Sequence, residues 1–141
     1  MDELPELLLS HYEDPYHRGR YDRATRGSQS HDPDSQHFVL VQLRVSDEGV
    51  VEEMWFDSQG CVYCEASASI LAQFCESKSI EELNEVDGAS YLALTQLDQV
   101  TAQPSCRMLA WTALQDSLKS TDIEYEDGHP MFGGPSLGEE S

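Results

Sequence analysis

Apolar and polar residues alternate over residues 38–46, the pattern of a β-strand with one buried face. Every second position of this segment is apolar: Val39, Val41, Leu43 and Val45. Gln42 and Arg44 lie between these positions and are therefore expected on the opposite face. The segment is the clearest strand prediction in the chain.

A hairpin follows from the residues after this strand. Asp47-Glu48-Gly49 predicts a short connecting loop, because glycine adopts positive φ without strain. Residues 50–57 are then the returning strand, and a bulge between Val51 and Met54 accounts for its broken alternation. We therefore expect a β-hairpin over residues 38–57.

Helical spacing dominates on both sides of this hairpin. Residues 4–13 place leucines at helical intervals, and Pro15 marks the end of that helix. Further helices are expected at 64–76, after the capping box Ser79-Ile80-Glu81-Glu82, at 88–98 and at 105–119. A polar loop is expected over 16–36. These elements predict an α+β fold, in which a small antiparallel sheet packs on a layer of helices.

The chain has 141 residues, a length that suits one compact domain with short tails. We expect this domain over residues 1–120 and a disordered acidic tail over 121–141, where Gly, Pro and acidic residues predominate. No apolar run approaches the length that crosses a bilayer, and the acidic first residues do not resemble a secretory signal. We therefore expect a cytoplasmic protein without a membrane partner.

Acidic residues outnumber basic ones by 27 to 8, which gives a formal charge of −19. Such a chain repels nucleic acid, so a nucleic-acid partner is not expected. The acidic surface has two interpretations, a heavily solvated surface or a docking surface for a basic partner. Half of the basic residues fall in the 16–36 loop, as Arg18, Arg20, Arg23 and Arg26, and form either a solvated loop or a local positive patch.

The four cysteines are Cys61, Cys64, Cys75 and Cys106. In a cytosolic chain, cysteines arranged in this way indicate metal or sulfur chemistry more than disulfides. Cys61 and Cys106 lie at predicted helix starts, where the helix dipole favours the thiolate. Cys64 lies one helical turn beyond Cys61, so the two could converge on one ion. The alternative is that these residues are small buried hydrophobic residues, which is our interpretation of Cys75, about 16 Å along the helix from Cys64.

Histidine could supply a fourth ligand. His37 directly precedes the first predicted strand and is the best placed of the five histidines. A set of His37, Cys61, Cys64 and Cys106 would suit tetrahedral zinc, which commonly takes three cysteines and one histidine. Iron–sulfur clusters usually take four thiolates, although histidine replaces some of them in certain centres.

Three segments resemble the IscU/NifU/SufU family of iron–sulfur cluster assembly scaffolds. Residues 11–19 (HYEDPYHRG) are similar to the family's H-Y-x-x-P-x-x-x-G opening. Residues 60–69 (GCVYCEASAS) are similar to its G-C-x-x-x-x-A-S-A-S segment. Residues 106–114 (CRMLAWTAL) are similar to the C-x-x-L-A-W-x-A-L of the Suf-type branch. The resemblance implies the α+β fold of IscU and the N-terminal domain of NifU.

The chain departs from this family at the first of its three cysteines. The family carries that cysteine in N-P-x-C-G-D, whereas residues 32–37 here read DPDSQH. Ser35 therefore replaces the cysteine, and His37 stands where the family has an aspartate ligand. Cys61 and Cys106 match family ligand positions. Cys64 matches none, but it could replace the missing thiolate.

The resemblance implies a scaffold rather than an enzyme. Such a scaffold accepts sulfur from a cysteine desulfurase, with Cys106 as the sulfur acceptor here, and binds iron and a transient [2Fe–2S] cluster, or Zn²⁺ at rest. Its partners would be the desulfurase and the acceptor apo-proteins that receive the cluster. Two alternatives stay open: a degenerate paralogue that carries sulfur or docks to a desulfurase without building a cluster, and an interaction protein with structural cysteines.

Overall fold

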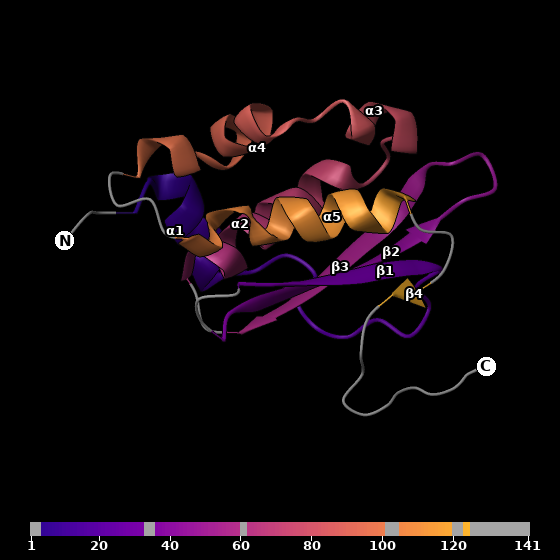
Figure 1. The fold of residues 1–141 in the computed structure, drawn as a ribbon, viewed down its shortest axis with the longest axis horizontal. Helices are drawn as coiled ribbons and strands as arrows, with labels where there is room; N and C mark the ends of the chain where they lie inside the picture. The colour runs from indigo at the N-terminus through magenta and orange to yellow at the C-terminus, as the bar shows by residue number, and fades with distance from the viewer. Residues whose placement is uncertain (1–3, 33–35, 60–61, 101–104, 120–122, 125–141) are drawn as a thin grey trace.

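The computed structural model describes residues 4–32, 36–59, 62–100, 105–119 and 123–124. Figure 1 shows the helices on one side of a twisted sheet. In chain order the elements are α1 (Glu6–Glu13), β1 (Arg26–His31), β2 (Phe38–Val45), β3 (Val51–Gln59), α2 (Val62–Cys75), α3 (Ile80–Asn84), α4 (Gly88–Thr95), η1 (Leu97–Gln99), η2 (Ser105–Met108), α5 (Leu109–Lys119) and β4 (Ile123–Glu124). No described helix is long and apolar enough to span a membrane.

The strands form a sheet in the order β3-β2-β1-β4, with β2 and β1 in the centre. The predicted hairpin is confirmed, because β2 and β3 pair antiparallel over residues 38–59. Arg44 pairs with Glu53 and Val45 pairs with Val51, so Glu52 is the extra residue of a bulge. This bulge lies between Val51 and Met54, as the broken alternation indicates.

The prediction of a continuous loop over 16–36 is wrong for Arg26–His31, which form β1. This strand pairs antiparallel with β2 over its full length and parallel with β4 at Gly27 and Ser28. Its sequence, RGSQSH, lacks the apolar alternation that predicts a strand. β1 forms because the backbone N–H and C=O groups of the buried strand β2 need hydrogen-bond partners on both sides. The cause therefore lies in the neighbouring strand and not in the sequence of β1.

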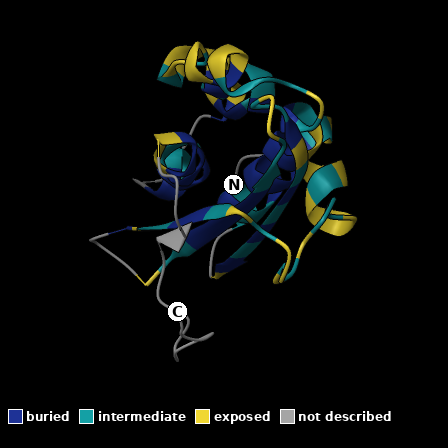
Figure 2. Ribbon diagram, turned by 90° about the vertical axis from the view of Figure 1, so that its right-hand side faces the viewer, coloured by how far each residue is buried: buried dark blue, intermediate teal, exposed yellow. Residues whose placement is uncertain are grey.

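Helices α2 and α5 pack on one face of the sheet, and α1 packs on α2. The two short helices α3 and α4 contact α5 and α2, respectively, and form an outer layer. Figure 2 shows that buried residues line the space between the sheet and these helices. The fold is therefore α+β, as predicted, with a core of side chains from β2, β3, α2 and α5.

The predictions of helices over 4–13 and 64–76 and after Ser79 are confirmed with small shifts at their ends. The helix predicted over 88–98 is wrong beyond Thr95, because Gln96 adopts a left-handed backbone with φ of 63° and ends α4 before the separate turn η1. The capping box at Ser79 is present, since its hydroxyl accepts from Glu82 N–H and the Glu82 carboxylate accepts from Ser79 N–H. The single helix expected over 105–119 is instead a 3₁₀ turn, η2, followed by α5. Ile123–Glu124 pair with β1 as β4, within the segment that the sequence predicts as a tail.

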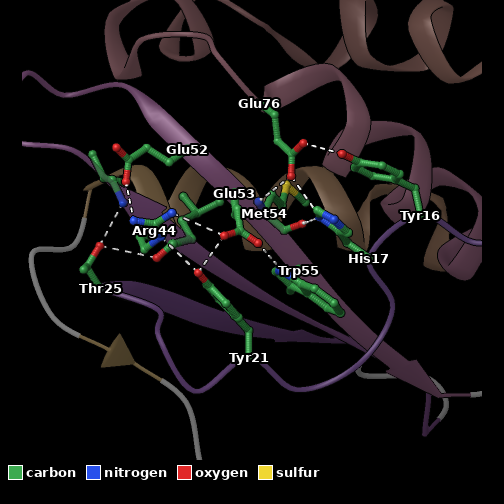
Figure 3. A network of polar contacts seen from close by, with 12 residues as sticks. Tyr16, His17, Tyr21, Thr25, Arg44, Glu52, Glu53, Met54, Trp55 and Glu76 are labelled. Atoms are coloured by element: carbon green, nitrogen blue, oxygen red, sulfur yellow. Dashed lines mark hydrogen bonds and ion pairs between the residues drawn. The ribbon is translucent and has the colours of Figure 1, made fainter.

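The second face of the sheet is covered by residues 16–25, which follow the edge of β3 (Figure 3). Gly19 N–H donates to Phe56 O at 2.7 Å, and Phe56 N–H donates to His17 O at 3.1 Å. The side-chain amide of Gln42 pairs with both the N–H and the C=O of Tyr21, each at 2.9 Å. Leu40 precedes Gln42 by two residues on this second face and is fully buried, although it is not part of the main core.

Helix α1 and the turn after it are attached to α2 through the hydroxyl of Ser69. Ser69 is fully buried, and its Oγ lies 2.7 Å from His11 Nδ1 and 2.7 Å from the Tyr16 backbone N–H that donates to it. One hydroxyl thus serves two polar groups from a segment more than fifty residues away in sequence.

We predict that Ser69→Ala lowers the free energy of unfolding by about 1–3 kcal/mol. The substitution removes the hydroxyl that donates to the His11 ring nitrogen and accepts from the Tyr16 N–H. Ser10→Ala, on the exposed side of α1, is the matched control and should change stability by less than about 0.5 kcal/mol. Urea unfolding followed by circular dichroism measures both. Equal stabilities for the two variants would contradict this role for Ser69.

Candidate thiol and metal site

The candidate ligands that the structure describes gather at one end of the sheet. Phe38 at the start of β2 pairs with Gln59 at the end of β3, so His37 lies next to the point where β3 ends. Only residues 60–61 separate β3 from α2, whose first turn carries Cys64. The topology therefore brings His37, the end of β3 and the first turn of α2 with Cys64 to the same end of the sheet.

Cys64 and Cys106 are in direct contact. The Cys64 thiol donates to the backbone carbonyl oxygen of Cys106 with a sulfur–oxygen distance of 3.3 Å. Both cysteines are buried, with 0% and 2% of their surface exposed. A thiolate has no proton to donate, so this bond requires the protonated form of the Cys64 thiol.

Side chains from two helices hold the turn that carries Cys106. Cys64 of α2 donates to the carbonyl of Cys106, and the hydroxyl of Tyr91 in α4 donates to the carbonyl of Arg107. Both donors come from outside η2, so they connect the backbone of this turn to α2 and α4. The position of Cys106 therefore depends on α2 and α4 together.

Cys61 and Ser35 lie outside the described residues, so their placement stays a prediction. His37 is half-buried, and its carbonyl accepts from Asp32 N–H at 3.0 Å across the turn between β1 and β2. Within the part of the chain that the structure describes, no group of three or more His, Cys, Asp or Glu side chains is arranged to hold a metal ion.

Cys75 lies at the far end of α2 and belongs to the core, as the sequence predicts. It is fully buried, and burial raises the pKa of its thiol to about 12, with the nearby Lys78 acting in the opposite direction. A thiol with this pKa stays protonated at neutral pH and is a poor nucleophile and metal ligand.

Arg18 is a residue of this region that sequence reasoning did not assign. Its guanidinium lies 3.1 Å from the Glu65 carboxylate and donates to the carbonyl of Ser58 at 3.3 Å. Ser58 precedes the β3–α2 connection and Glu65 follows it, so Arg18 links both ends of the segment that contains Cys61. Arg20 pairs with Asp57 at 3.1 Å, and Arg26 donates to the Leu118 carbonyl at 2.9 Å.

Three of the four arginines of the 16–36 segment therefore have partners within the chain. These contacts attach the segment to β3, α2 and α5. No sequence pattern signals this, because the acidic partners are distant in sequence.

A polar network around Glu76 anchors the segment just before Arg18 (Figure 3). The Glu76 carboxylate accepts hydrogen bonds from the Tyr16 hydroxyl and the Met54 N–H, and it lies 2.9 Å from His17 Nδ1. The bond to Glu76 raises the pKa of Tyr16 to about 12. His17 stacks between Tyr16 and Trp55, with ring centroids 4.0 and 4.4 Å away, and adopts a left-handed backbone with φ of 58°.

The ring of His11 titrates below its usual range. Burial lowers the pKa of His11, and the nearby Asp14 carboxylate acts in the opposite direction. A neutral imidazole can accept the Ser69 hydroxyl proton at Nδ1, whereas a protonated ring cannot. The contact between His11 of α1 and Ser69 of α2 therefore favours the neutral form of His11.

These features define an α+β protein with buried thiols at the end of its sheet where β3 leads into α2. The chain belongs to the family of NifU-like N-terminal domains, whose model matches residues 5–125. The match covers every element from α1 to β4.

Individual proteins show the same likeness. The iron–sulfur cluster assembly scaffold protein IscU of Escherichia coli K12 is 26% identical over 124 residues, covering 86% of this chain and 92% of that protein. A SUF-system putative iron–sulfur cluster assembly scaffold protein from Fervidobacterium islandicum superposes with a TM-score of 0.66 at 14% identity, over 82% of this chain and 96% of the other. A nitrogen-fixing NifU-like protein (N-terminal) from Brucella abortus superposes with a TM-score of 0.65 at 16% identity, over 82% and 91% of the two chains.

We predict that His11 makes stability depend on pH near neutrality. Because the folded-state pKa of His11 lies below the unfolded value of 6.5, its contribution is complete above that pH and is lost as the pH falls toward the folded pKa. Urea unfolding of the parent and of His11→Gln between about pH 7.5 and about pH 5 measures this contribution. The parent should lose more stability than the variant over this range, and parallel losses would contradict the prediction.

Proposed function

We propose that this protein is a scaffold for iron–sulfur cluster assembly. It accepts sulfur from a cysteine desulfurase, combines it with iron as a [2Fe–2S] cluster, and passes the cluster to acceptor apo-proteins. Support comes from its family and from relatives that are named as assembly scaffolds. The observation that carries the proposal is the contact of the Cys64 thiol with the backbone carbonyl of Cys106, which joins residues from two distant motifs.

The chemistry of the donor set suits iron or zinc. Cys61 and Cys106 would supply two thiolates, Cys64 a third, and His37 an imidazole nitrogen. These are the soft and borderline ligands that iron–sulfur clusters and Zn²⁺ prefer. Binding at Cys64 requires its thiol to lose the proton that it donates to the Cys106 carbonyl, so metal binding should release protons and strengthen as pH rises.

A second candidate function is sulfur transfer without cluster assembly. The bond from Cys64 to the Cys106 carbonyl favours it, because a thiol that makes this bond is not acting as a thiolate ligand. In that case Cys106 would carry sulfur, and Cys64 would only hold the Cys106 turn. The two functions differ in what removal of the Cys64 side chain does to metal affinity.

We predict that Cys61→Ala and Cys64→Ala each lower metal affinity about tenfold or more, as loss of a direct ligand does. His37→Ala should cost somewhat less, because the three thiolates remain. Chelator-competition titrations with Zn²⁺ and Fe²⁺, performed anaerobically on the purified variants, measure these affinities.

Cys75→Ala is the matched control, since it removes an equally buried thiol on the same helix. It should lower stability and leave metal affinity unchanged. If Cys64→Ala binds metal like the parent while Cys61→Ala does not, Cys64 is not a ligand and sulfur transfer becomes the better proposal. If the parent itself binds neither metal, the scaffold proposal fails.

We also predict that Cys106 is the sulfur acceptor. Incubation with a cysteine desulfurase and cysteine should add about 32 Da, one sulfur atom, to the peptide that contains Cys106. Peptide mass mapping under non-reducing conditions, after trapping with an alkylating reagent, identifies the modified residue. Addition at Cys75 and not at Cys106 would contradict the assignment. Cys75 is expected to stay unmodified, because its buried thiol has a pKa raised to about 12 and is a poor nucleophile.

A further inference from the structure

We propose that Cys64 is a resolving thiol that releases sulfide from sulfur carried on Cys106. The inference rests on the proposed function, which loads Cys106 with a persulfide. It assigns to Cys64 a redox role that a metal ligand or a purely structural residue would not have.

The geometry places the two cysteines within reach of a disulfide. A carbonyl oxygen lies about 2.4 Å from the Cα of its own residue, so a Cys64 sulfur 3.3 Å from Cys106 O lies within about 6 Å of the Cys106 Cα. A cysteine sulfur lies about 2.8 Å from its own Cα, so the two Cα atoms lie within about 8.5 Å of each other. Disulfides join Cα atoms about 4.4–6.8 Å apart, so the sulfur atoms meet by rotation of the two side chains, together with a shift of the η2 turn where the separation exceeds that range.

Burial favours an internal reaction over an external one. Cys106 is 2% exposed, so thiols in solution have little access to it in this arrangement. Cys64 is fully buried against the same turn. Loading from an outside donor requires Cys106 to leave this position, and its return brings the sulfur to Cys64. Cys75, the other described cysteine of α2, is at the far end of the helix and cannot take this role.

The reaction balances without an added reductant. The Cys64 sulfur attacks the inner sulfur of the Cys106 persulfide, a new sulfur–sulfur bond joins the two cysteines, and the outer sulfur leaves as hydrosulfide. The Cys64 proton goes to the leaving group, so the products are a Cys64–Cys106 disulfide and hydrogen sulfide. The carried sulfur is reduced by two electrons, and the two cysteine sulfurs are oxidised by two.

This step would deliver sulfur in the oxidation state that a cluster contains. Cys61 and His37 stay free to bind iron during the step, whereas Cys64 and Cys106 become ligands only after a dithiol reductant has opened their disulfide. The disulfide blocks a second round until a dithiol reductant opens it. The chain would therefore release about one sulfide for each persulfide loaded, and further release would need that reductant.

The test loads the parent, Cys64→Ser, Cys61→Ser and Cys75→Ser with a cysteine desulfurase and cysteine. Each protein is then separated from small molecules and incubated anaerobically without reductant. Released sulfide and intact mass are followed over time. The parent should release about one sulfide per persulfide and end about 2 Da lighter than the unloaded protein. Non-reducing peptide mapping of the parent should show Cys64 joined to Cys106.

Cys64→Ser should keep the extra 32 Da on Cys106 and release sulfide at least about tenfold more slowly until a dithiol is added. Cys75→Ser should behave like the parent. Circular dichroism of each variant confirms folding, and the linked peptide in the parent tests the proposal without any variant.

Three results would overturn the inference. The parent and Cys64→Ser could hold the persulfide equally, sulfide release could depend on Cys61 instead, or the sulfur could move intact to Cys64 by attack on the outer atom. A failure of the proposed function looks different, because then no protein, Cys64→Ser included, gains 32 Da on Cys106. That result would overturn the resolving role as well.

Discussion

The burial of β2 on both faces is the constraint on which the rest of this fold depends. Val39, Val41 and Leu43 belong to the core that α2 and α5 cover, and Leu40 and Gln42 are buried on the opposite face. A strand buried in this way needs hydrogen-bonded neighbours at both edges and a cover over each face. β1 and β3 supply the edges, the helices supply one cover, and residues 16–25 supply the other.

This arrangement also determines where the chemistry can occur. Because β2 starts where β3 ends, His37 and the β3–α2 connection meet at one end of the sheet. Because α2 and α5 lie side by side on the same face, the first turn of α2 reaches the 3₁₀ turn that precedes α5. The contact of Cys64 with the Cys106 carbonyl is the result, and Tyr91 holds the same turn from the outer layer.

The family motifs combine structural and chemical residues. His11, Tyr16 and Ser69 come from two of these motifs, and their contact attaches α1 and its following turn to α2. Arg18, from the first motif, links the residues on either side of the connection that contains Cys61. The opening motif therefore supports the site by positioning the segments around it, whereas the cysteines of the other two motifs carry the thiol chemistry that we propose.

The sequence by itself determined the elements whose signals are local: the 38–57 hairpin and its bulge, the helices, the capping box at Ser79 and the α+β class. Three motifs also identified the family. It did not predict β1, because RGSQSH forms a strand only through its pairing with β2. It did not predict the partners of Arg18 or Glu76 either, which lie more than twenty residues away in sequence. Spacing alone left open whether Cys64 meets Cys61 or another group. Only the packing of α2 against the turn before α5 decided that its thiol lies on the Cys106 carbonyl, because contacts between distant segments depend on how the helices pack and leave no periodic pattern in the chain.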